Sequence, residues 1–478
     1  MHRLGQGWSR FSLLLLAAAY WVFFQFTLHS PGLPERQASW IFLGVLSWMA
    51  SRTYRERAPG RFSNFADLLR RKAPRSWLGL GWALLAVFFI YRYWQAGGFG
   101  GVFTRYEPFM DQGHYFNMAE KIRTWNVGPR DYNYGLGYPG LAAATSWIWP
   151  RDPFLIVDCL CYSGGISLFF LILRQLGLPR GVALLVCLYA ALNGYWIAYM
   201  LTPWSSSATF VAYAAALWVS LKPDRSSRDY LTFGFAAGIL FVARYVDVIL
   251  VLPIGIALIW TEIQSIGIER TLRKVAGGVL ISTVIFGGVL LSHRLILGGY
   301  LETPYRWHTH PGEQTTDADL HYYLRRSLAS VVFHLQGQLV EARSGDPHYA
   351  QALPTKETLF VVNPLMLFAP AGLFLVMQDW RRRGQPRRIA WGIAVGLALF
   401  LLIYGLHPGT APGCKIFGSL HYFKAPSILF LAGGCIYCWR LMTGYTERWR
   451  LLALGAGTLL WYALIAGLIY CLPASQLT

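Results

Sequence analysis

About thirteen long apolar runs divide this chain, and no other feature of the sequence limits its possible folds as strongly. They lie at residues 11–28, 38–50, 77–95, 154–173, 181–193, 204–221, 231–243, 246–260, 275–297, 359–377, 390–406, 426–440 and 451–472. A helix needs about 20 apolar residues to cross a bilayer, so the shorter runs would include flanking polar residues or cross at a tilt. Charged residues make up only 14% of the chain, against about 25% in a typical soluble domain. The sequence therefore predicts an all-α integral membrane protein with about thirteen transmembrane helices.

Basic residues gather in the short segments that separate alternate apolar runs. The clusters occupy residues 52–75, 222–228, 270–274, 381–388 and 440–450. If every run crosses once, all of these clusters fall on one side, which the positive-inside rule assigns to the cytoplasm. Membrane orientation then explains the formal net charge of +19, and we expect no nucleic-acid partner. The longer polar segments would face the periplasm of a bacterium or the lumen of a eukaryotic organelle, and we expect a bacterial inner membrane.

Four regions follow from this pattern. Residues 1–76 would hold two N-terminal transmembrane helices and a basic cytoplasmic loop, because no small-residue cleavage site follows the first run. Residues 77–298 would form a seven-helix module that includes the outer loop 97–153. Residues 299–358 would form a large outer loop folded as a small helical cap, and residues 359–478 would supply the C-terminal transmembrane helices.

Metal and redox patterns in the sequence are weak. Cys435 and Cys438 form a CxxC pattern inside an apolar run, which we interpret as packing rather than as a redox or zinc site. His308 and His310 lie in the second outer loop, but no third zinc ligand has a suitable spacing, so a solvated histidine cluster is favoured. We therefore expect no metal site, although a divalent metal is compatible with the sequence.

The polar, aromatic and glycine-rich segment 105–140 is the strongest candidate for chemistry. Asp111 begins a helical pattern whose apolar positions are Tyr115, Met118, Ile122 and Trp125, and we expect that face to lie on a membrane surface. Asp111 has two compatible interpretations. It caps the start of the helix, or it acts as a general base that accepts a proton from an attacking hydroxyl group.

Three cations near the outer membrane edge are candidate anion ligands. Arg244 and Asp247 flank the break between two short apolar runs, where charges are costly without a partner. Arg244 either pairs with Asp247 or binds an anion such as phosphate. Lys415 and Lys424 lie in or beside the third outer loop, and they either snorkel to lipid headgroups or clamp a phosphate.

Together these features resemble the GT-C superfamily of membrane glycosyltransferases, in particular the branch with protein O-mannosyltransferases and the lipid A aminoarabinose transferase. The matching features are Asp111 in the first large outer loop, a following helix with Tyr115, the Tyr138–Pro139 pair, and Arg244 near the start of a later span. The predicted seven-helix module followed by a long outer loop also matches. The chain departs from the family where Asp111 is followed by Gln112 instead of a second acid, and it has no WWDYG-type signature.

The resemblance implies a transferase that uses a polyprenyl-phosphate-linked sugar as donor and inverts the anomeric carbon. Asp111 would be the catalytic base, and the departing phosphate would be held by Arg244, Lys415 and Lys424. The resemblance suggests that the acceptor or the sugar contacts His114, Tyr115, Tyr138, Tyr305 and His348. The acceptor would be a glycan, a lipid or a protein outside the cytoplasm, membrane lipids would surround the chain, and no cofactor is required.

Two other functions stay open from the sequence. A transporter or flippase for a lipid-linked or anionic substrate would use the same basic outer residues, but it needs charged or broken helices near the bilayer midplane. A structural or assembly subunit would keep the fold without catalysis, which the missing second acid allows.

Overall fold

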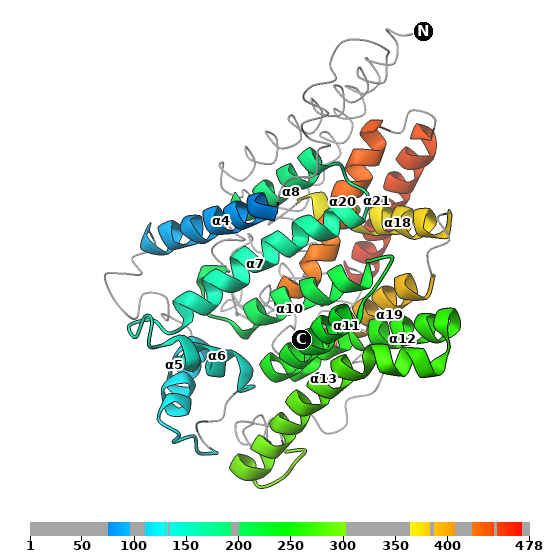
Figure 1. The fold of residues 1–478 in the computed structure, drawn as a ribbon. Helices are drawn as coiled ribbons and strands as arrows, with labels where there is room; N and C mark the ends of the chain where they lie inside the picture. The colour runs from blue at the N-terminus through cyan, green and yellow to red at the C-terminus, as the bar shows by residue number, and fades with distance from the viewer. Residues whose placement is uncertain are drawn as a thin grey trace.

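The computed structural model in Figure 1 describes most of the chain from residue 75 onward. The described residues are 75–95, 110–129, 131, 134–192, 200–302, 364–382, 387–406, 423–443 and 447–470. Within these ranges the chain forms helices and short turns without a strand, which confirms the all-α prediction for this part of the protein. The helices are α4 (Arg75–Gln95), α5 (Met110–Arg123), α6 (Gly137–Thr145), α7 (Phe154–Gln175), α8 (Arg180–Leu192), α10 (Ser205–Ser220), α11 (Ser227–Ala243), η1 (Tyr245–Leu250), α12 (Leu252–Ile266), α13 (Ile268–Leu297), η3 (Pro364–Phe368), α18 (Ala369–Arg382), α19 (Arg387–Leu406), α20 (Lys424–Thr443) and α21 (Arg448–Tyr470).

Four helical segments of the described chain are long and apolar enough to cross a membrane. They are α7, the combined segment Tyr245–Ile266, α13 and α20. Shorter apolar helices occur at Gly79–Trp94, Arg180–Leu192 and Leu365–Trp380. Each predicted apolar run from residue 77 onward overlaps a described helix, whereas the first two runs lie outside the described residues. The total of thirteen spans therefore stays a prediction.

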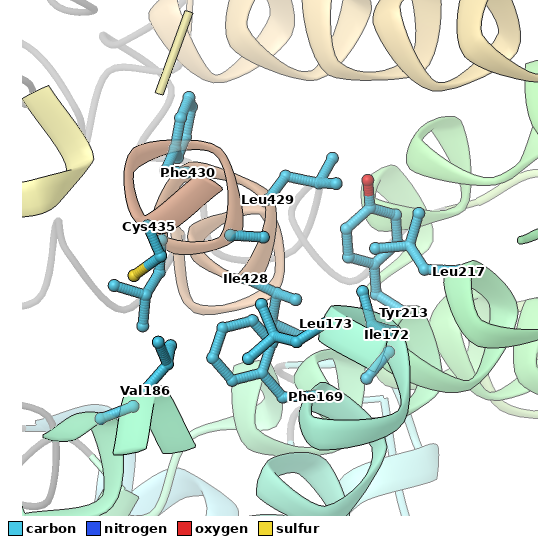
Figure 2. Close-up of a cluster of buried hydrophobic side chains, with 14 of the residues drawn as sticks. Phe169, Ile172, Leu173, Val186, Tyr213, Leu217, Ile428, Leu429, Phe430 and Cys435 are labelled. Carbon is cyan, nitrogen blue, oxygen red and sulfur yellow. The ribbon is translucent and has the colours of Figure 1, made fainter. Parts of the chain in front are cut away.

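The centre of the bundle is built on α10 and α20, which are buried along almost their whole length. Helix α10 packs against α7, α11 and α20. Figure 2 shows one layer of this core, in which Ile428 of α20 lies near Phe169 and Leu173 of α7 while Leu429 lies on the side toward Tyr213 of α10. Because lipid is as apolar as these side chains, close packing rather than water exclusion holds such helices together in a membrane.

Glycines allow the closest helix contacts. A Cβ atom on Gly278 of α13 would lie 2.2 Å from the carbonyl oxygen of Tyr230 in α11. A Cβ atom on Gly434 of α20 would lie 1.8 Å from the carbonyl oxygen of Leu365 in η3. Both positions exclude any larger residue without a shift of backbone, which is the pattern expected where small residues set the approach of membrane helices.

Contacts between α11, α12, α13, α18, α19 and α20 bring their basic turns together at one end of the bundle. Arg388 at the start of α19 hydrogen-bonds to Gln264 near the end of α12. Arg440 near the end of α20 pairs with Asp379 of α18. We call this end of the bundle the basic end. It holds four of the five predicted basic clusters, while residues 52–74 of the fifth lie outside the described residues.

Glu262 is the centre of a buried polar cluster at the basic end. Its carboxylate accepts hydrogen bonds from the Tyr230 hydroxyl at 2.8 Å and from the Lys274 ammonium at 2.7 Å. The Arg225 guanidinium lies 3.5 Å from the same carboxylate. The side chains of Arg225 and Glu262 are only 4% and 7% exposed, so this largely buried cluster joins α11, α12, α13 and the turn after α10.

Candidate functional site

The opposite end of the bundle carries α5 and α6, seen at the lower left of Figure 1, and we call it the α5–α6 end. Helix α6 packs against α5, α7, α10 and α11. The side chains of Tyr115 and Met118 on α5 are 3% and 0% exposed, because they contact protein. The expectation that this face lies on a membrane surface is therefore wrong for these two residues. Ile122 is half-buried, and only Trp125 is fully exposed.

Asp111 is the second residue of α5, and its side chain lies outside the described residues. The helix begins one residue earlier, so Asp111 lies inside the first turn rather than before it. A carboxylate in a first turn is stabilised by the positive end of the helix dipole. Its role as a general base stays a prediction. His114, one turn further along, is half-buried, and its ring centre lies 6.4 Å from that of Tyr134.

Tyr115 and Tyr138 are engaged by protein contacts. The Tyr138 ring stacks on Phe154 with centres 4.7 Å apart, and its hydroxyl donates a 2.7 Å hydrogen bond to Asp158. The Tyr115 hydroxyl lies 3.0 Å from the Ser205 hydroxyl. Both tyrosines thus attach α5 and α6 to the bundle, which makes them positioning residues in this structure. Direct contact of either ring with a sugar stays a prediction.

Helix α10 begins with three consecutive buried serines, Ser205, Ser206 and Ser207, which we call the serine turn. The Lys424 ammonium donates a 3.1 Å hydrogen bond to the Ser207 hydroxyl, and Lys424 is only 4% exposed. Lys424 is also the first residue of α20, so the N-termini of two helices meet at this point. A cation beside two helix N-termini is electrostatically unfavourable by itself, whereas the same arrangement suits an anion.

Two polar atoms near the serine turn have no hydrogen-bond partner within the described part of the chain. They are the side-chain oxygen of Gln112 and the hydroxyl of Ser206, both fully buried. The Gln112 amide nitrogen donates to the Pro203 carbonyl oxygen at 3.4 Å, which places α5 beside the start of α10. Buried polar atoms of this kind are rare in folded proteins and point to a bound water or ligand.

Asp158 is a buried charged group that the sequence analysis missed. It lies in the first turns of α7 and is 0% exposed. The Tyr138 hydroxyl that bonds to Asp158 belongs to a ring that packs against Tyr115, and the Tyr115 hydroxyl lies beside Ser205, so two tyrosines link Asp158 to the serine turn. The signal was present in the sequence, because an acid inside an apolar run is rare and marks functional or paired sites.

Arg244 lies at the point where α11 ends and the chain turns into η1. Its guanidinium lies 3.8 Å from the carboxylate of Asp247, which is fully buried. The structure thus contains the contact between the two residues that the sequence suggested. The segment between α5 and α6 reaches the same place, since a Cβ atom on Gly135 would lie 2.5 Å from the Val242 carbonyl oxygen. Only glycine allows this approach of the loop to the end of α11.

The remaining predicted site residues, Lys415, Tyr305 and His348, lie outside the described residues, as do His308 and His310. Among the described residues no cluster of three or more His, Cys, Asp or Glu side chains is suited to a metal ion. Cys435 and Cys438 are buried and carry no disulfide, as expected of packing residues.

The described fold defines an all-helical protein with helices able to cross a membrane and a buried polar site at one end of its bundle. No protein-family model, curated protein sequence or solved structure matches the chain. The likeness to the GT-C superfamily accordingly depends on the residues described above.

Proposed function

We propose that the protein is a glycosyltransferase that moves a sugar from a polyprenyl-phosphate-linked donor to an acceptor outside the cytoplasm, with inversion of the anomeric carbon. One observation supports this function above the others. Lys424 and Arg244, which the sequence suggests as phosphate ligands, lie on elements that contact the segment 105–140 around Asp111. Lys424 contacts the serine turn, to which α5 is joined through Tyr115. Arg244 directly follows the Val242–Ala243 backbone against which Gly135 packs.

In the proposed reaction, Asp111, Lys424 and Arg244 each have a separate role. The acceptor hydroxyl or amine attacks the anomeric carbon, and its proton passes to the Asp111 carboxylate. The bond between the anomeric carbon and the phosphate oxygen breaks, and the electron pair leaves with the lipid phosphate. Lys424, Arg244 and the positive N-terminal end of α10 stabilise the charge that develops on that phosphate. The isoprenoid tail would lie along the apolar helices.

The proposed orientation of the protein in the membrane follows from the positive charge at the basic end. Positive charge at cytoplasmic turns would place the α5–α6 end on the extracytoplasmic side. In a bacterial inner membrane that side is the periplasm, where a lipid-linked sugar is the expected form of activated donor.

Transport of a lipid-linked or anionic substrate is the second candidate, and the buried charges favour it more than the sequence did. Asp158 and Lys424 are buried in helices able to span the membrane. The helical run from α11 into η1 is interrupted at Arg244. Charged groups and broken helices of this kind line substrate paths in transporters.

The deciding experiment reconstitutes the purified protein with radiolabelled polyprenyl-phosphate sugars extracted from the native host. We expect transfer by the wild type and a loss of about 100-fold or more in Asp111→Asn, since general base catalysis contributes that much. Glu120→Gln is the matched control, because Glu120 is an exposed acid on the same helix. Full transfer by a folded Asp111→Asn variant would refute the assigned base. Movement of the lipid across the bilayer without transfer would identify a transporter instead.

A further inference from the structure

Trp125 has a backbone conformation that is unusual for its residue type. Its φ angle is +55°, and it is the only non-glycine residue of the described chain with a positive φ. It ends α5 in a left-handed turn, in which the Trp125 amide bonds to the Ile122 carbonyl at 3.1 Å and the Asn126 amide to the Lys121 carbonyl at 2.9 Å. Glycine occupies such positions in most proteins, because any side chain there strains the backbone.

The side chain of Trp125 does not compensate for this strain by packing on the protein. It is 94% exposed, the largest exposure among the large hydrophobic residues of the described chain. Tyr115 and Met118 on the same helical face contact the bundle, whereas the left-handed turn carries the Trp125 ring away from it. Strained residues of this kind persist where something beyond local folding requires them.

The residues around Trp125 indicate which environment the exposed ring faces. Val127, two residues later, packs with Met118 against Leu297 at the C-terminal end of α13. Helix α13 is long enough to span a membrane and exposes most of its surface, including Leu295, which is 76% exposed. The turn with Trp125 therefore lies where an apolar, outward-facing helix ends, which is the level of a membrane boundary.

The charges beside Trp125 fit the same boundary. Lys121 and Arg123 lie in the last turn of α5. Past the end of α13, Tyr300 and Leu301 are 56% and 86% exposed. Tryptophan and tyrosine concentrate at the headgroup level of membranes, and lysine and arginine extend toward lipid phosphates there.

We propose that Trp125 inserts into the headgroup region of the membrane leaflet at the α5–α6 end and anchors α5 at a fixed depth. Its partner is phospholipid, and the left-handed turn is what points the ring into it. Asp111 lies at the other end of the same helix, about 20 Å away at 1.5 Å per residue, so the anchor sets the position of that carboxylate relative to the bilayer. The proposal does not depend on which reaction the protein carries out.

The first test places a nitroxide spin label at Trp125→Cys in phospholipid nanodiscs and measures its relaxation by oxygen and by a water-soluble nickel chelate. The two cysteines outside the described residues, Cys414 and Cys471, are replaced by serine first, and the others are buried. Labels at Val284→Cys, on the exposed side of α13, and at Asp224→Cys, in an exposed turn, give the lipid and water references. We expect the label at 125 to lie between them, with oxygen relaxation at least twofold above the water reference.

The second test asks whether the ring holds α5 in place. Hydrogen exchange of the α5 amides in nanodiscs should be faster in Trp125→Ala than in the wild type and unchanged in Trp125→Tyr, which keeps an interfacial ring. A label at 125 that behaves like the water reference overturns the proposal. Identical exchange in both variants also overturns it. Protection of a water-exposed label by an added glycan would mean that Trp125 contacts a soluble acceptor and not lipid.

Discussion

Replacing Glu262 by glutamine removes the one carboxylate of the described residues that contacts both Arg225 and Lys274 at the basic end. The loss of one partner from a buried pair costs about 3–5 kcal/mol, because the remaining charge stays desolvated. Arg225 is the critical group, since its side chain is 4% exposed, whereas Lys274 at 23% can still reach water. We therefore expect Glu262→Gln to lower the free energy of unfolding by about 3 kcal/mol, the lower end of that range.

Reversible unfolding in mixed dodecylmaltoside and SDS micelles, followed by far-UV circular dichroism, measures this difference. Glu269→Gln is the matched control, because Glu269 pairs with Arg273 while both side chains are more than 70% exposed, at 77% and 78%. Such a surface pair contributes little. Adding Arg225→Gln to Glu262→Gln should recover part of the loss, because it removes the buried cation that Glu262→Gln leaves without its carboxylate. Equal effects of Glu262→Gln and Glu269→Gln would refute the reasoning from burial.

Two further changes test other contacts. In Gly135→Ala the new Cβ would lie 2.5 Å from the Val242 carbonyl oxygen, so we expect a loss of about 1–3 kcal/mol in the same unfolding assay, as for overpacked interiors. Gly140→Ala should be neutral, since nothing lies within 4 Å of its added Cβ, and an equal loss in both would contradict the contact. Burial opposes ionisation of Asp229, but hydrogen bonds from Lys222 and the capped helix start outweigh it, so the pKa of Asp229 lies below its ordinary value of 3.8. Its contribution to stability is therefore complete above pH 3.8 and disappears as the pH falls through the lowered pKa, so acid titration of stability should be flatter in Asp229→Asn than in the wild type.

Much of the helical arrangement could be predicted from run lengths and from the basic turns, because a membrane allows few alternatives to a helix. The direction of the apolar face of α5 could not. Tyr115 and Met118 have the same spacing whether their partner is lipid or another helix, and both environments are apolar. Only the positions of α6 and α10 decide between them, and those depend on contacts far apart in the sequence.

The candidate site could likewise be predicted from the sequence only in part. Arg244 and Lys424 stood out because charges beside apolar runs are costly. The serine turn did not, because it lies at the start of the predicted apolar run 204–221 and carries no charge that would mark it as a site. The hydrogen bond from Lys424 to Ser207 joins residues 217 positions apart, and no local pattern predicts it.

The length of α13 has a consequence for the whole molecule. Its 30 residues extend about 45 Å, but the first seven include the basic cluster 270–274. The apolar part, residues 275–297, extends about 35 Å, slightly more than the roughly 30 Å of a bilayer's hydrocarbon, so we expect it to cross with a tilt. The tight crossing at Gly278 would make α11 follow that tilt, and α11 ends at Ala243, directly before Arg244. We therefore expect bilayer thickness to affect the geometry of the site. Lipids with shorter acyl chains should tilt α13 further and change the position of Arg244 relative to Lys424. Equal activity in bilayers of short-chain and long-chain lipids would show that α11 moves independently of α13.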